Sequence, residues 1–200
     1  MRQPPTSAVI GAYVAGYIVL TATDVASTLW GVNAGAAQEF NSTVATEAGG
    51  LHLESMLMIN GAVLTFTALM LVWALGRTDR IDPRYLERPH RAVFNWFYLN
   101  PFSSKIQPRS VFHYLAIPLT LLGMKAFATL NNTLIALTLP DVVTPWALPL
   151  GQAIGPVWAF WAVIVVLFHS LFWPSLIIAA AFVRHLRAAD RAPARSPTLA

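Results

Sequence analysis

Two charged residues lie inside long apolar segments of this chain, and they are its best candidates for chemistry. Asp24 lies within the apolar stretch 8–32, and Lys125 lies within 112–139. A charge at bilayer depth is costly, so such residues are usually paired and commonly mark functional sites. A carboxylate and an ammonium together can bind a ligand, an ion or a proton, or they can fasten two helices to each other.

Counting along the two segments places both charges at a similar depth. If both segments enter the membrane from the same side, Asp24 lies about 24 Å beyond Ala8 and Lys125 about 20 Å beyond Phe112. A difference of less than one helical turn allows the two side chains to meet, so we expect an ion pair. Further polar residues at comparable levels complete this predicted layer: Thr28 in the first segment, Asn60 in the second and Asn132 in the third.

The predicted polar layer has two interpretations. In the first, the layer only holds the helices together. Interhelical polar bonds contribute about 0.6 kcal/mol each in measured membrane proteins, and a buried ion pair can fix the helix register. As a functional site, the layer would form a small polar cavity for a ligand, an ion or a proton. A transporter normally also has discontinuous helices or internal repeats, and neither is clear in this sequence. The residues alone leave both interpretations open.

The histidines do not form a metal-binding motif. None of the five is followed by another four residues later, and the absence of cysteine excludes Cys-ligated metals. His169, within Val165 to Trp173, resembles the single histidine that ligates bacteriochlorophyll in light-harvesting helices. Ligation of haem or bacteriochlorophyll by His169 is therefore one hypothesis, and we otherwise expect no cofactor. No nucleophile or phosphate loop accompanies these residues, so the sequence favours a non-catalytic protein over an enzyme.

The elements that must position these residues are membrane-spanning helices. The chain has 200 residues, of which 56% are hydrophobic and 11% are charged, whereas soluble domains carry about 25% charged residues. Four apolar stretches are each long enough to cross the hydrocarbon core, which requires about 20 residues. We therefore expect an all-α fold, an integral membrane four-helix bundle forming one domain over 1–190, with a disordered tail over 191–200. The expected spans are 8–32, 54–75, 112–139 and 157–183.

Basic residues alternate between the two sides of the predicted bundle. The connection 76–111 carries seven Lys and Arg residues, whereas the connections 33–53 and 140–156 carry none. By the positive-inside rule, both termini are cytoplasmic. The net charge of +4 follows from this topology, so we expect no nucleic-acid partner. Arg greatly outnumbers Lys and Ala is abundant, which indicates a bacterium, and we expect the inner (cytoplasmic) membrane.

Two connections have recognisable composition. The segment 89–100 is rich in aromatic residues next to Arg91, a pattern typical of the headgroup region, and it predicts a short interfacial helix on the cytoplasmic surface. The connection 140–156 contains four prolines and predicts a stiff outer loop. A cleaved signal peptide ending near Ala36 is disfavoured, because its apolar region would end well before the cut and Asp24 would lie between them.

One pattern at the end of the first span resembles a known family. It combines Asp24, Thr28, Gly31 and Gly35 with Glu39-x-Asn41. This resembles an uncharacterised family of small bacterial multi-spanning membrane proteins, in which an intramembrane Asp precedes a Gly-rich turn and Glu-x-Asn-Pro. Here Ser42 replaces the proline. The resemblance implies an integral membrane fold and a constellation of Asp24, Glu39 and Asn41, but no activity.

These observations favour one function over two others. The first is a non-catalytic integral membrane protein, an accessory or assembly subunit of a larger membrane complex. Its partners would be the lipid bilayer and other membrane proteins. The second is a small transporter or ligand-binding bundle that uses Asp24 and Lys125. The third is a haem- or pigment-binding subunit that uses His169.

Overall fold

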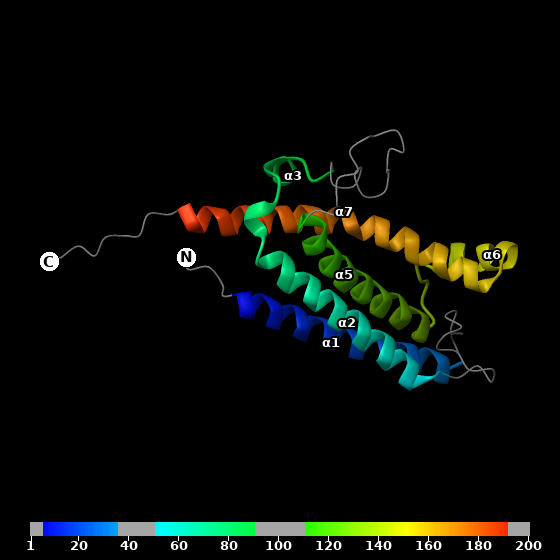
Figure 1. Ribbon diagram of the computed structural model, residues 1–200. Helices are drawn as coiled ribbons and strands as arrows, with labels where there is room; N and C mark the ends of the chain where they lie inside the picture. Colours follow the sequence, from blue (N-terminus) through cyan, green and yellow to red (C-terminus); the bar gives the residue numbers. More distant parts are fainter. Residues whose placement is uncertain (1–5, 36–50, 91–110, 192–200) are drawn as a thin grey trace.

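The computed structural model describes residues 6–35, 51–90 and 111–191. These described residues are 88% helical and contain no strand. Four helices are long and apolar enough to cross a membrane. The all-α, multi-pass helical bundle predicted from the sequence is therefore confirmed (Figure 1).

The four spanning helices agree with the predicted segments at most of their ends. They are α1 (Thr6–Asn33), α2 (Leu53–Leu75), α5 (Val111–Ala136) and α7 (Pro156–Arg191). The predicted end of the fourth helix at 183 is wrong, because α7 continues through Arg191. Arg184 and Arg187 continue the helix beyond the apolar span, since arginine is a good helix former. Residues 192–200 of the predicted tail lie outside the described residues.

The third connection is a helix, so the prediction of a stiff loop over 140–156 was wrong. Helix α6 covers Thr144–Ile154. Its first turn is capped by Asp141, whose Oδ1 accepts hydrogen bonds from the backbone N–H groups of Val143 and Thr144 at 2.8 and 2.7 Å. Pro145 fits here because the first helical positions need no intrahelical N–H donor. Gly155, with φ +88°, then reverses the chain into α7.

Two short helices follow α2 and connect it toward the region before α5. They are η1 (Thr78–Arg80) and α3 (Pro83–Glu87). Asp82 caps α3, since its carboxylate accepts from the backbone N–H of Arg84 at 2.9 Å. Most of the interfacial helix predicted over 89–100 lies outside the described residues.

Helix α5 is the centre of the bundle. It packs against α1, α2 and α7, and α1 also packs against α2. The core combines Phe112, Leu115 and Ala116 of α5 with Phe172 and Leu176 of α7. The ring of His113 is buried there and stacks on Phe172, with centroids 6.3 Å apart.

Helix α7 packs into the bundle over only part of its length. Its fully buried residues between 172 and 183 recur every three or four positions and face α5, whereas between 156 and 168 only Ala159 is buried. Figure 1 shows α7 diverging from α5 toward the end where α6 lies. Helix α6 is the element that packs beside this outer part of α7.

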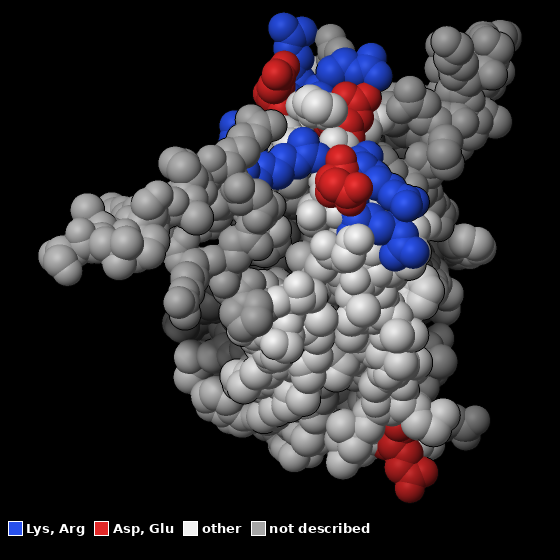
Figure 2. Space-filling model, turned by 60° about the vertical axis from the view of Figure 1, so that its left-hand side comes forward, with Lys and Arg blue, Asp and Glu red and all other residues white. Residues whose placement is uncertain are grey.

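Charges collect at one end of the bundle. Figure 2 shows the basic side chains gathered at that end, with a long uncharged surface separating them from an acidic side chain at the other. The described basic residues at this end follow α2 or lie late in α7: Arg77, Arg80, Arg84, Arg88, Arg184 and Arg187. The two ends of the bundle therefore differ strongly in charge.

Candidate functional site

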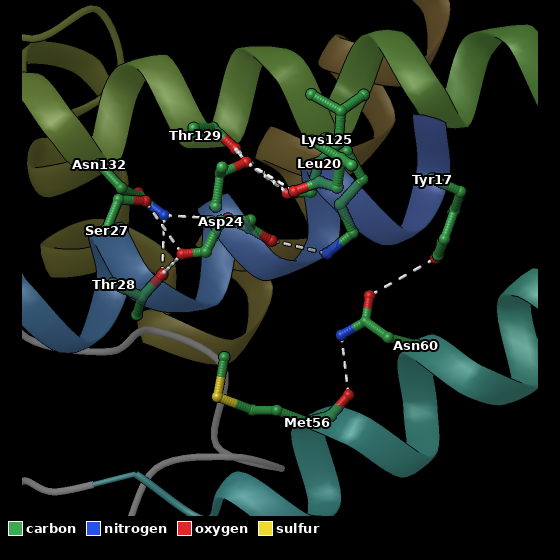
Figure 3. Close-up of polar contacts among 12 residues, drawn as sticks. Tyr17, Leu20, Asp24, Ser27, Thr28, Met56, Asn60, Lys125, Thr129 and Asn132 are labelled. Carbon is green, nitrogen blue, oxygen red and sulfur yellow. Dashed lines mark hydrogen bonds and ion pairs between the residues drawn. The ribbon is translucent and has the colours of Figure 1, made fainter. Parts of the chain in front are cut away.

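The two charges within the spans form an ion pair between α1 and α5. Lys125 Nζ donates a hydrogen bond to Asp24 Oδ2 at 2.6 Å (Figure 3). The Asp24 side chain is 12% exposed and that of Lys125 is 20% exposed, so both charges are largely removed from solvent. The contact that we predicted from matching depths is confirmed, and each charge neutralises the other inside the bundle.

Asn132 connects the Asp24 carboxylate to the hydroxyl group of Thr28 on α1. Its Nδ2 donates to Asp24 Oδ1 at 3.2 Å and to Thr28 Oγ1 at 2.9 Å. The Thr28 hydroxyl in turn donates to the backbone carbonyl of Asp24 at 2.8 Å. Both carboxylate oxygens therefore accept a hydrogen bond from α5, which lowers the cost of burying the negative charge. Of the predicted layer, the structure thus brings together Asp24, Lys125, Asn132 and Thr28.

The Lys125 ammonium is less completely bonded than the carboxylate. An ammonium has three N–H donors, and only the one directed at Asp24 has an acceptor among the described residues. Thr129 lies one turn further along α5. Its hydroxyl oxygen is 3.4 Å from both the Thr23 hydroxyl and the Leu20 carbonyl. This side of the layer is therefore polar but loosely connected.

Asn60 does not join the ion pair, although its depth suggested that it would. Its Oδ1 accepts from the Tyr17 hydroxyl at 3.5 Å, and its Nδ2 donates to the Met56 carbonyl of its own helix at 2.7 Å. Asn60 therefore lies at the interface of α1 and α2, whereas Asn132 lies at that of α1 and α5 (Figure 3). Counting residues placed Asn60 at an adequate depth, but a depth does not show which neighbouring helix a residue faces.

A second polar contact of α1 with α2 was not anticipated from the sequence. The hydroxyls of Tyr13 and Thr67 are 2.5 Å apart and buried. Tyr13 precedes Tyr17 by four residues, so it extends the polar stripe of α1 by one turn. That spacing is the signal that could have revealed it.

Asn131 has a different role from its neighbour Asn132. Its Oδ1 accepts from the backbone N–H groups of Val142 and Val143 at 3.1 and 3.3 Å. Asn131 therefore ties the end of α5 to the start of α6. Two consecutive asparagines thus serve two interfaces, because adjacent residues on a helix point about 100° apart.

Among the described candidates, His169 lies on a helix that carries no residue of this layer. His169 Nδ1 lies 2.8 Å from the Val165 carbonyl of its own helix α7, whereas the ion pair joins α1 and α5. Glu39 and Asn41 lie outside the described residues. Within the described ranges, no group of three or more His, Asp or Glu residues is arranged to hold a metal ion.

Comparison with protein-family models, curated proteins and solved structures found no match to this chain. The resemblance of the pattern from Asp24 to Asn41 therefore stays a prediction. The layer contains a neutralised ion pair, the Asn132 amide and several hydroxyls, without a nucleophile beside a base.

The ion pair predicts a non-additive response to mutation. Asp24→Asn and Lys125→Met should each lower the melting temperature and folded yield in detergent, because each leaves one buried charge unpaired. Breaking one side of a buried pair typically costs about 3–5 kcal/mol, whereas replacing both partners can be nearly neutral. The double variant should therefore be more stable than either single variant.

Asp79→Asn provides the matched control. Asp79 is exposed, and its side chain has no partner among the described residues, so this substitution should leave the melting temperature nearly unchanged. Additive losses in the two single variants would show that Asp24 and Lys125 do not stabilise each other.

Proposed function

We propose that this chain is a non-catalytic accessory or assembly subunit of a larger complex in a bacterial inner membrane. The observation that carries the proposal is the hairpin of α6 and the first part of α7, which lies outside the packing of the other three spans.

The ion pair is suited to holding α1 against α5. Both oxygens of the Asp24 carboxylate are used within the bundle, and its charge is balanced by Lys125. A polar contact of this kind specifies which faces of two helices meet, since any rotation would leave charges exposed to hydrocarbon. This supports a structural role for the layer, so we expect the contact with a partner on the outer surface of the bundle.

The hairpin of α6 and α7 presents large apolar side chains that no other spanning helix covers. Trp158 is 67% exposed and Trp161 is 55% exposed. Val157 is also exposed, as are Leu148 and Ile154 on α6. Figure 1 shows α7 diverging from α5 here, and apolar side chains are exposed both on the hairpin and at Leu130 in the outer half of α5. A helix of another membrane protein would bury both.

The length of α7 places part of this hairpin beyond the hydrocarbon. From Pro156 to Arg184, the first charged residue after the apolar run, the helix extends about 42 Å, whereas the hydrocarbon core is about 30 Å thick. With Arg184 at one interface, the Trp158 end reaches the opposite headgroup region. Tryptophan is accommodated at that level, but lipid tails do not cover the exposed aliphatic side chains of Val157, Leu148 and Ile154 there, which favours contact with a protein partner.

Photo-crosslinking in native membranes tests this proposal. A benzophenone side chain placed at Trp158 or Trp161 should give a discrete adduct with a different protein. The same side chain at Trp30 should not, although Trp30 is 48% exposed at the same end of the bundle. The double variant Trp158→Ser, Trp161→Ser should lose that protein during purification in mild detergent, and Trp30→Ser should keep it. Adducts of equal yield from all three positions, or an adduct of the chain with itself, would contradict the proposal.

The charge asymmetry of the bundle supports an orientation with both termini in the cytoplasm. The end with six arginines would face inward, by the positive-inside rule. The natural chain has no cysteine, so single cysteines report their own position.

Glu87→Cys and Thr138→Cys test this orientation, since both residues are exposed and lie at opposite ends of the bundle. An impermeant thiol reagent added to intact cells with a permeabilised outer membrane should label Cys at 138 and not at 87. Lysis should make both reactive. Labelling of position 87 in intact cells would contradict the orientation.

The incomplete bonding of Lys125 supports a second candidate, a bundle that binds a small neutral ligand. Two of its N–H donors have no acceptor in the described part of the chain, so a carbonyl or hydroxyl group of a ligand would complete them. A neutral ligand is favoured because the pair itself is already neutral. If this role is correct, small molecules extracted from the purified native protein will include one that is missing from the folded variant Asp24→Asn, Lys125→Met. Identical extracts would leave only the structural role.

A further inference from the structure

Arg187 fixes the turn after α2 onto the end of α7. Its Nη2 donates to the backbone carbonyls of Thr78 and Ile81 at 2.6 and 2.9 Å, and it lies 3.3 Å from that of Asp79. One guanidinium thus donates to several carbonyl groups around η1, including that of Thr78, which also accepts the long 3.3 Å bond from the Ile81 N–H. As a result, the residues of this turn and those late in α7 lie together at one end of the bundle.

The arginines at this end divide into two groups by their contacts. Three are already engaged. Arg187 is held by the carbonyls above, Arg84 forms a bidentate pair with Asp82 with its closest contact at 2.6 Å, and Arg77 lies 4.5 Å from the ring centroid of Trp73. The other three are exposed, and their guanidinium groups have no hydrogen-bond or ion-pair partner in the described ranges: Arg80, Arg88 and Arg184.

Two of the unengaged arginines lie on the two segments that the Arg187 contact joins, the turn after α2 and the end of α7. Arg80 lies in the turn whose carbonyls Arg187 binds, and Arg184 precedes Arg187 by one helical turn on the same side of α7. The carboxylates described at this end are Asp79, Asp82 and Glu87, so six arginines face three acids and the local charge is +3. The pair of Arg80 and Arg184 therefore has an excess of positive charge around it.

The depth of this end identifies the anions that it meets. Helix α2 ends at Leu75, and the apolar run of α7 ends at Val183, so both helices leave the hydrocarbon here. Trp73 and Arg77 form an aromatic and cationic contact typical of the headgroup region. Guanidinium groups at this level lie beside lipid phosphates, which they can bind with two parallel hydrogen bonds.

We infer that Arg80 and Arg184 form a binding site for the phosphate group of an anionic phospholipid. A zwitterionic headgroup has an ammonium of its own, which the surrounding positive charge repels. An anionic headgroup has no such ammonium, so the site selects anionic lipids. Arg187 acts as a positioning residue, since it holds the turn that presents Arg80. The site works in the same way on either face of the membrane, so it is independent of the orientation and of any protein partner.

Native mass spectrometry of the purified full-length protein tests the inference. Phosphatidylglycerol should form discrete one-lipid adducts with the native chain, whereas phosphatidylcholine with the same acyl chains should bind much more weakly. Arg80→Gln and Arg184→Gln should each weaken phosphatidylglycerol binding about fivefold, and the double variant about 25-fold, from the electrostatic contribution of each basic residue near an anionic lipid. Their melting temperatures without lipid should not change, because both side chains are exposed.

Two controls separate this site from general electrostatics. Arg84→Gln removes the same charge from the same end but affects a guanidinium that Asp82 already occupies, so it should change lipid binding less than twofold. The double variant Arg80→Lys, Arg184→Lys keeps the charge and should still lose part of the affinity, because an ammonium cannot form the bidentate contact. Equal adducts with both lipids, equal weakening by Arg84→Gln, or displacement of the lipid by millimolar inorganic phosphate would overturn the inference.

Discussion

The cost of an unpaired charge inside a bilayer is the constraint on which the arrangement of this bundle depends. Asp24 and Lys125 lie on different helices, and each is tolerated only where the other lies opposite it. This requirement fixes how far α1 slides along α5 and which face it turns toward α5. Asn132 and Thr28 then fit at the next turn, which makes the register more specific. The remaining helices pack around a pair whose geometry leaves little freedom.

Helix α5 uses different chemistry for its different neighbours. Toward α1 it presents Lys125 and Asn132, toward α7 the buried ring of His113, and toward α3 the ring of Phe112, which stacks on Tyr85. Inside a membrane the hydrophobic effect does not drive helices together, so van der Waals packing and hydrogen bonds must supply the attraction. The polar face determines the register of α1, and the close-packed aromatic face holds the inner half of α7. A single helix can therefore organise the whole bundle.

The two ends of α7 have different roles because they face different surroundings. Its inner half buries one face in the bundle and ends in arginines, of which Arg187 binds the neighbouring turn. Its outer half leaves the bundle and carries exposed tryptophans beside α6. The inner end carries the exposed guanidinium of Arg184, whereas the outer hairpin carries exposed tryptophans, so the two ends offer surfaces of different chemistry. The proposed subunit role and the proposed lipid site thus use opposite ends of the same helix.

The sequence by itself determined the four spans, their ends to within a few residues at seven of the eight positions, and the similar depths of Asp24 and Lys125. Hydropathy and the rise per residue are properties of each segment alone, so they can be counted along the chain. Only the tertiary structure decided that Asn60 faces Tyr17, that 144–154 is helical, that α7 diverges from α5, and that Arg187 binds the turn at Thr78. These features depend on the rotation of each helix about its axis and on which helices are neighbours. Both are set by contacts between residues that are far apart in the chain, and no local pattern contains them.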